Sequence, residues 1–191
     1  MFIPRKFLLT VAILASAITL SACSSTANSG LTGSSSSTSS AFNKADVSFA
    51  SDMTAHHQQA VEMSQLILDK SNIDSRVITL ANEITAAQGP EIKQMKSWLS
   101  DWGQKSESMA GMDMSGTLMS DSDMADLKTA TALTASKLFL TQMTTHHTSA
   151  ISMATTEVAA GKNADALTLA KKIISTQTTE ITTMGAILST L

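Results

Sequence analysis

The chain has 191 residues, of which 15% are charged and 4% aromatic, and 13 Lys and Arg against 16 Asp and Glu give it a formal net charge of −3. This composition excludes a nucleic-acid-binding surface, because there is no basic stripe and no aromatic side chain is interleaved with Lys or Arg. The single cysteine, Cys23, excludes a disulfide within the chain.

The N-terminus has the pattern of an export signal. Two basic residues precede an apolar stretch, residues 7–20, which is too short to span a bilayer comfortably as a mature helix. The tetrapeptide Leu-Ser-Ala-Cys that ends at Cys23 resembles the lipobox of bacterial lipoproteins, in which the cysteine is lipidated. We therefore expect residues 1–22 to be a lipoprotein signal peptide and Cys23 to anchor the exported protein to the cell envelope. The alternative is an ordinary signal peptide in which Cys23 is incidental.

Residues 23–41 are expected to form a tether rather than a folded segment. They are dominated by Ser, Thr and Gly, which cannot bury enough apolar surface to fold. The remaining residues, 42–191, are enough for one domain.

This domain contains an internal repeat. The motif Met-x-x-His-His-x-x-Ala-x-x-Met begins at Met53 and again at Met143, 90 residues later. The motif Gln-x-x-Glu-Ile-x-x-Met begins at Gln88 and again at Gln177, 89 residues later. The halves are therefore copies, and the hairpin turn of one copy differs in length from that of the other by one residue. The copies cover about 44–102 and 122–191, and residues 103–121 form the crossover between them.

Both repeated segments have helical periodicity. Their apolar residues recur at spacings of three and four, from Phe49 to Ile67 and from Ile84 to Trp102. We predict an all-α fold, an antiparallel four-helix bundle made of two duplicated helical hairpins. The predicted helices cover residues 44–70, 73–101, 122–160 and 163–190. Within the second helix, Gly89-Pro90 predicts a kink or a short break.

All four histidines of the chain lie in the two Met-x-x-His-His motifs. On a helix, Met53 lies one turn before His56 and His57, so a thioether and imidazoles can point to a common place. This combination suits copper, above all the cuprous ion, because soft sulfur selects a soft metal. The predicted metal ligands are Met53, His56, His57, Met63, Met143, His146, His147 and Met153.

Core packing is the alternative role for these residues, because methionines at helical spacing usually fill a core. Four polar residues on the inner stripes of the second and fourth helices bear on the choice: Gln88, Glu91, Gln177 and Glu180. Glu91 and Glu180 are candidates for carboxylates that bond the far nitrogen of a metal-ligating histidine. They could equally pair with His57 and His147 in a metal-free polar network, and the sequence leaves both possibilities open.

The crossover is rich in methionine. Met109, Met112, Met114 and Met119 resemble the Met-x-x-Met-x-Met clusters of bacterial periplasmic copper proteins, and we predict a weak cuprous site there. Packing of these methionines against the end of the bundle is the alternative.

No catalytic residues are predicted. The sequence has neither a Ser, His and acid set nor a glycine-rich phosphate loop, and it lacks the Glu-x-x-His motifs of a di-iron bundle. We therefore expect a protein that is not an enzyme.

The two His-His motifs, the Gln-x-x-Glu-Ile-x-x-Met segments and the ending Trp98-Leu-Ser-Asp-Trp102-Gly are similar to those of the DUF305 family, over residues 44–191. The resemblance implies an exported bacterial protein with a ferritin-like four-helix fold and no established enzymatic activity. Some members are implicated in periplasmic copper binding and copper tolerance. The resemblance selects the same eight His and Met positions, while Gly89-Pro90 departs from the usual pattern.

We therefore expect an envelope-located protein that sequesters or delivers copper. Its expected partners are the metal ion, the membrane through Cys23, and either an envelope protein or a second copy of the chain. The main rival is a non-catalytic helical interaction module in which His and Met fill the core. A ferritin-type metal oxidase is the third hypothesis.

Overall fold

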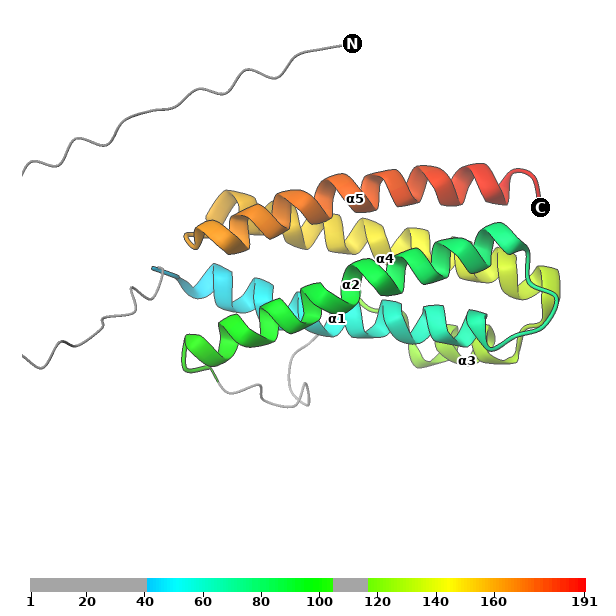
Figure 1. Cartoon of the computed structure of the whole chain (residues 1–191), viewed down its shortest axis with the longest axis horizontal. Helices are drawn as coiled ribbons and strands as arrows, with labels where there is room; N and C mark the ends of the chain where they lie inside the picture. The colour runs from blue at the N-terminus through cyan, green and yellow to red at the C-terminus, as the bar shows by residue number, and fades with distance from the viewer. Residues whose placement is uncertain (1–40, 105–116) are drawn as a thin grey trace, which may run out of the picture. The chain divides into compact units, whose positions relative to one another are not determined.

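The computed structural model describes residues 41–104 and 117–191 (Figure 1). This part of the chain contains five helices and no strand, which confirms the predicted all-α fold. The helices are α1 (Lys44–Leu68), α2 (Ser75–Asp101), α3 (Asp121–Thr129), α4 (Ala132–Ala160) and α5 (Ala164–Leu188). None of them combines the length and the apolar character needed to cross a membrane. The predicted signal peptide, Cys23, most of the tether, and Met109, Met112 and Met114 lie outside the described residues.

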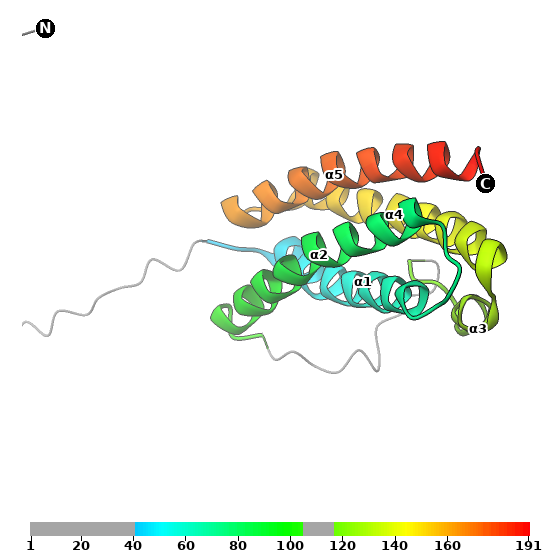
Figure 2. The ribbon, with the colours of Figure 1, turned by 45° about the vertical axis from the view of Figure 1, so that its right-hand side comes forward.

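The four long helices form two antiparallel hairpins, α1 with α2 and α4 with α5 (Figures 1 and 2). The hairpins meet mainly through α1 and α4, whereas α2 and α5 hardly touch each other. The first helix of each copy therefore lies at the centre of the bundle, and this placement brings the two Met-x-x-His-His motifs to the interface between hairpins.

The prediction of one continuous helix over 122–160 is wrong, because this segment forms two helices, α3 and α4. Ser120 and Asp123 form a capping box that starts α3, and Ala130 and Thr131 adopt extended backbone angles between the two helices. This break lets α3 turn back onto α1 and α4 and bury Leu127 completely. Burial of that side chain favours the break over a continuous helix.

The short break predicted at Gly89-Pro90 is absent, since α2 remains helical through Pro90. Pro90 and Ala86 are both exposed, so the Ala86 carbonyl that loses its usual donor can bond to water instead.

The core consists of two apolar clusters. The first cluster includes Ala60, Met63, Ile67, Leu80, Ile84, Leu127, Phe139, Leu140, Met143 and Met184. The second cluster includes Phe49, Met53, Met95, Leu99, Trp102, Ala150, Ala154, Leu169 and Ile173. Along α1 the second cluster ends at Met53 and the first begins at Ala60, and α4 passes between them from Met143 to Ala150. Both His-His pairs fall in these gaps, so a polar layer separates the two clusters.

Asp46 ties the start of α1 to the turn between α4 and α5. Its Oδ1 accepts hydrogen bonds from the backbone N–H groups of Lys162 at 2.9 Å and Asn163 at 2.8 Å, and its Oδ2 accepts one from Asn43 at 2.6 Å. Burial raises the pKa of Asp46, but these bonds outweigh burial and keep it below its ordinary value. Burial and the neighbouring Asp46 raise the pKa of Glu157, in the last turn of α4, to about 8. Glu157 is therefore protonated at neutral pH.

Replacing Glu157 with Gln should stabilise the protein at alkaline pH. In the unfolded chain the carboxyl ionises near its ordinary pKa of 4.5, whereas in the folded protein it keeps its proton up to about pH 8. Wild-type stability therefore falls as the pH rises from 4.5 to 8 and levels off above 8. Glutamine resembles the neutral acid and removes this loss. We expect Glu157→Gln to be about 1–3 kcal/mol more stable than wild type at pH 8, and about equal to it near pH 4.5.

Denaturant unfolding at a series of pH values measures this difference. Glu62→Gln is the control, because Glu62 lies exposed on α1. A difference between Glu157→Gln and wild type that does not change with pH would contradict the protonated state of Glu157.

Candidate metal centre

The two His-His pairs meet in the middle of the bundle. His56 of α1 and His146 of α4 stack with their ring centroids 3.6 Å apart and their planes tilted by 32°. All four histidines, including His57 and His147, are 0% exposed. The two motifs therefore converge on one cluster, a point that the sequence did not resolve.

Each hairpin adds a carboxylate to this cluster. His57 Nε2 lies 2.9 Å from Glu91 Oε2, and His147 Nε2 lies 2.7 Å from Glu180 Oε2. Burial raises the pKa of Glu91, but hydrogen bonds from His57 and Lys172 outweigh it, so the pKa lies below its ordinary value. Glu91 is thus ionised and accepts a hydrogen bond from His57 Nε2, while His57 Nδ1 has no hydrogen-bond partner in the described residues. The same geometry holds for His147.

Six imidazole nitrogens in this cluster have no hydrogen-bond partner within the described part of the chain. They are Nδ1 and Nε2 of His56, Nδ1 and Nε2 of His146, and Nδ1 of His57 and of His147. A buried polar atom without a partner costs about 1–3 kcal/mol. Native structures contain few such atoms, and each one calls for an unseen partner such as an ion or a water molecule.

The two central histidines are held in the neutral state. Burial, helped by His57 and His147, lowers the pKa of His56 to about 3, although the nearby backbone of Thr117 and His146 favours protonation. Burial and the surrounding histidines lower the pKa of His146 well below its ordinary value. At pH 7 both rings therefore present lone pairs, as metal ligands must.

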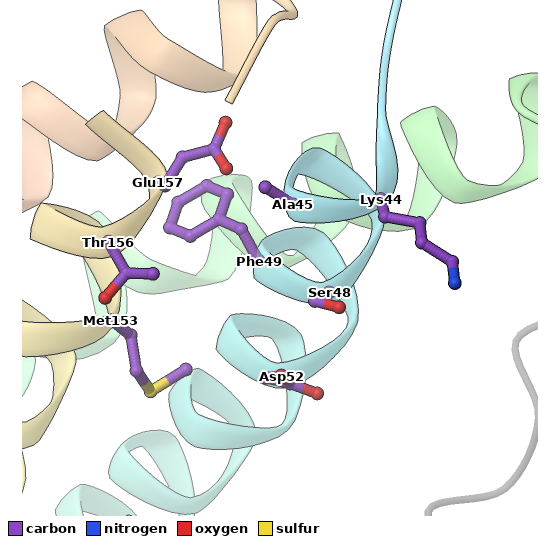
Figure 3. A pocket seen from close by; sticks show the side chains of 8 residues that line it. All are labelled: Lys44, Ala45, Ser48, Phe49, Asp52, Met153, Thr156 and Glu157. Carbon is purple, nitrogen blue, oxygen red and sulfur yellow. The ribbon is translucent and has the colours of Figure 1, made fainter. Parts of the chain in front are cut away.

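The predicted methionine ligands flank the histidines on both sides. Met63 and Met143 are completely buried in the first cluster, and Met53 is completely buried in the second. Met153 packs against the second cluster and is only half-buried. It also lines a surface pocket between α1 and α4 (Figure 3), so it is the least enclosed of the predicted ligands. Each cluster is thus in contact with one predicted methionine ligand from each copy of the repeat.

Imidazoles and carboxylates alone do not form a complete metal site here. Within residues 41–104 and 117–191, no group of three or more His, Cys, Asp or Glu side chains is placed to hold a metal ion. A metal ion in this cluster would therefore need a thioether ligand, a shift of the stacked rings, or both. The first option agrees with the mixed Met and His set predicted from the sequence.

Gln88 and Gln177, the other two polar residues predicted to support the histidines, occupy equivalent positions on α2 and α5. Both are 3% exposed, and the Oε1 atom of each lacks a hydrogen-bond partner in the described residues. Together with Glu91 and Glu180 they line a small cavity between α2 and α5.

One described methionine of the crossover has a structural role. Met119 is half-buried and packs against the first cluster. Its backbone N–H donates to Gln59 Oε1 at 2.8 Å, and its carbonyl accepts from Gln59 Nε2 at 2.9 Å. Met119 therefore packs against the bundle, which is the role that the alternative to a cuprous site in the crossover predicted. The other methionines of that predicted site lie outside the described residues.

Sequence reasoning missed Lys172, whose Nζ lies 3.0 Å from Glu91 Oε1. The repeat contains a signal that could have found it. Residue 83, the equivalent position in the first copy, is a glutamate, so the repeated helices carry opposite charges there.

Comparison with known proteins places the chain among proteins of similar fold and sequence. A candidate secreted DUF305 protein from Streptomyces coelicolor is 33% identical, with a TM-score of 0.70 over 76% of this chain and 91% of that one. A DUF305 fragment from Deinococcus radiodurans is 29% identical, with a TM-score of 0.71 over 78% and 98%. CopM in its Cu(I)-bound form is 30% identical, with a TM-score of 0.64 over 76% and 96%.

No functionally curated protein matches the chain. The model of the family described as "Domain of unknown function (DUF305)" matches residues 46–188, which is most of the chain. This match confirms the predicted resemblance, and the chain belongs to the DUF305 family.

Proposed function

We propose that the protein binds copper, in the cuprous state, at the cluster formed by His56, His57, His146 and His147, and that it sequesters or delivers the ion without catalysing a reaction. The observation that carries this proposal is the set of six imidazole nitrogens that are completely buried and have no hydrogen-bond partner in the described residues. A bound ion would satisfy several of them at once.

The carboxylates support metal ligation by His57 and His147, which we call the outer histidines. Glu91 and Glu180 each hold one ring nitrogen, which orients the imidazole and makes its other nitrogen a better donor. Nδ1 of His57 and Nδ1 of His147 would then be the ligating atoms.

The ligand types favour a soft metal ion. Buried thioethers flank the imidazoles, and the chain offers no thiolate here, because its single cysteine lies far outside the domain in sequence. Solved structures of CopM with Cu(I), Cu(II) and Ag, 28–31% identical to this chain, also support metal binding. The choice of the cuprous state rests on the soft thioether ligands and on the complete burial of the histidines.

The proposed place of action is the cell envelope. The likeness to a candidate secreted protein supports export. Lipidation of Cys23 remains a prediction from the sequence.

Titration of the full chain with Cu(I) in the presence of a competing chelator should reveal binding that depends on the four histidines. Replacing all four with Ala removes every imidazole ligand, so we expect affinity to fall by about a hundredfold or more, equal to about 2.7 kcal/mol. Wild-type affinity no better than that of the quadruple variant would refute the proposal.

A matched pair of methionine variants separates ligation from packing. Met143→Leu and Met184→Leu both conserve volume in the first cluster, but only Met143 belongs to a Met-x-x-His-His motif. Loss of affinity in Met143→Leu alone is the expected result.

Cu(I) should also raise the midpoint of thermal unfolding. A ligand at a hundred times its Kd stabilises the native state by about 2.7 kcal/mol, which shifts the midpoint by several degrees. The rival interaction module makes the opposite prediction. A midpoint indifferent to copper, together with loss of folding when His56 and His146 are replaced, would favour that rival.

The ring of His56 should stay neutral throughout the mildly acidic range. Because burial lowers its pKa to about 3, its nitrogen and carbon chemical shifts should not change between pH 7.5 and 5, whereas those of the denatured chain titrate near 6.5. NMR of the imidazole resonances measures this directly. A titration of His56 centred near pH 6 would show that the ring is hydrated.

A further inference from the structure

The buried histidines are closed off at both ends of the bundle. Met143 and Ala60 of the first cluster lie on one side of them along the helices, and Met53 and Ala150 of the second cluster lie on the other. All four residues are 0% exposed. An ion approaching along the bundle axis would have to cross a full apolar cluster.

One lateral side is covered by chain. Residues 117–119 run beside α1, where the backbone of Thr117 lies next to His56. The two hydrogen bonds between Gln59 and Met119 fasten this segment to α1. An ion would have to displace backbone on this side.

Another lateral side lies between α2 and α5, which hardly touch each other. In the described part of the chain, a slot there is lined by Ala87, Gln88, Glu91, Ile173, Thr176, Gln177 and Glu180, and it has room for about one water molecule. We call it the α2–α5 slot. Its lining includes the two carboxylates that bond His57 and His147.

The lining of the slot combines apolar side chains, Ala87 and Ile173, with oxygen atoms that can hold a cation. The Oε1 atoms of Gln88 and Gln177 are buried without a hydrogen bond in the described residues. Two such oxygens, together with the carboxylates of Glu91 and Glu180, make a cation-attracting surface outside the imidazoles. Oxygen ligands hold a soft ion weakly, so they suit passage rather than storage.

The slot is not symmetric, although the repeat is. On one side Lys172 places its ammonium group 3.0 Å from Glu91 Oε1, while its own side chain is 61% exposed. Glu180 has no lysine partner among the described residues, and the position equivalent to Lys172 is Glu83. One cation of the protein itself is thus already paired with a carboxylate that lines the slot.

We propose that the α2–α5 slot is the route by which a metal cation reaches the buried histidines, and that Lys172 is the gate of this route. The proposal rests on the proposed copper-binding function. An arriving cation displaces the ammonium group from Glu91, meets the more deeply buried Gln88 and Gln177 oxygens, and then passes to the imidazoles. Lys172 slows arrival and departure alike, because an ion crosses the same place in both directions.

Transfer of Cu(I) between the full chain and a coloured chelate, followed by stopped-flow absorbance in both directions, tests the gate. Lys172→Met should raise the loading and the removal rates together by about threefold to tenfold. Lys171→Met is the matched control: it removes the same charge from the next position of α5, where the side chain is exposed and makes no ion pair in the described residues. We expect less than a twofold change in its rates.

A second pair of variants tests the route itself. Ala87→Phe places a ring in the slot, whereas Ala86→Phe places the same ring on the exposed face of α2. Ala87→Phe should slow both rates by at least about fivefold, and Ala86→Phe should leave them unchanged. Circular dichroism and thermal unfolding establish that all four variants are folded.

The outcomes separate the route from the function. If wild type binds Cu(I) but both Lys172→Met and Ala87→Phe keep wild-type rates, the route is wrong and the function stands. If Lys172→Met raises the loading rate and lowers the removal rate by the same factor, Lys172 acts on affinity through Glu91 and is not a gate. If wild type takes up no Cu(I), the function and the route both fail.

Discussion

Burial of four imidazoles between two hairpins is the constraint on which the rest of the structure depends. An imidazolium cannot be placed in this interior without a large desolvation cost, so the central rings stay neutral and keep their lone pairs. Apolar clusters on both sides keep water out, and completely buried alanines, Ala60 and Ala150, allow α1 and α4 to approach closely. Of the four rings, those of His57 and His147 bond the carboxylates of Glu91 and Glu180.

The duplication explains why these groups meet at all. Because both copies place the same motif on the helix that faces the other hairpin, equivalent side chains come together at the α1–α4 interface. The copies are nonetheless unequal where they face solvent. Lys172 neutralises Glu91, while the equivalent position opposite Glu180 carries another glutamate. The symmetric interior therefore holds the proposed metal ligands, and the asymmetric rim lies on the proposed route to them.

Much of the fold could be predicted because it depends on local spacing. The 3/4 periodicity around Met53 and the repeat at Met143 were enough to place two hairpins, and the inner position of Glu91 suggested a bond to His57. The break between α3 and α4 could not be predicted, because it depends on the burial of Leu127 against other helices. Three further features likewise depend on how the two hairpins dock: the convergence of the histidines, the contact of Lys172 with Glu91, and the protonated state of Glu157. No local sequence pattern contains information on this docking.

The hydrogen bonds of Asn43 and Asp46 to the α4–α5 turn also determine how the bundle would bear a mechanical load. A pull through the residues before Asn43 reaches the folded domain where the Asn43 side chain donates to the Ala160 carbonyl at 2.8 Å and Asp46 holds Lys162 and Asn163. Three hydrogen bonds to the α4–α5 turn would share that force. Tension on the residues before Asn43 would therefore be passed to the hairpin of α4 and α5, and α1 would not separate from that hairpin first.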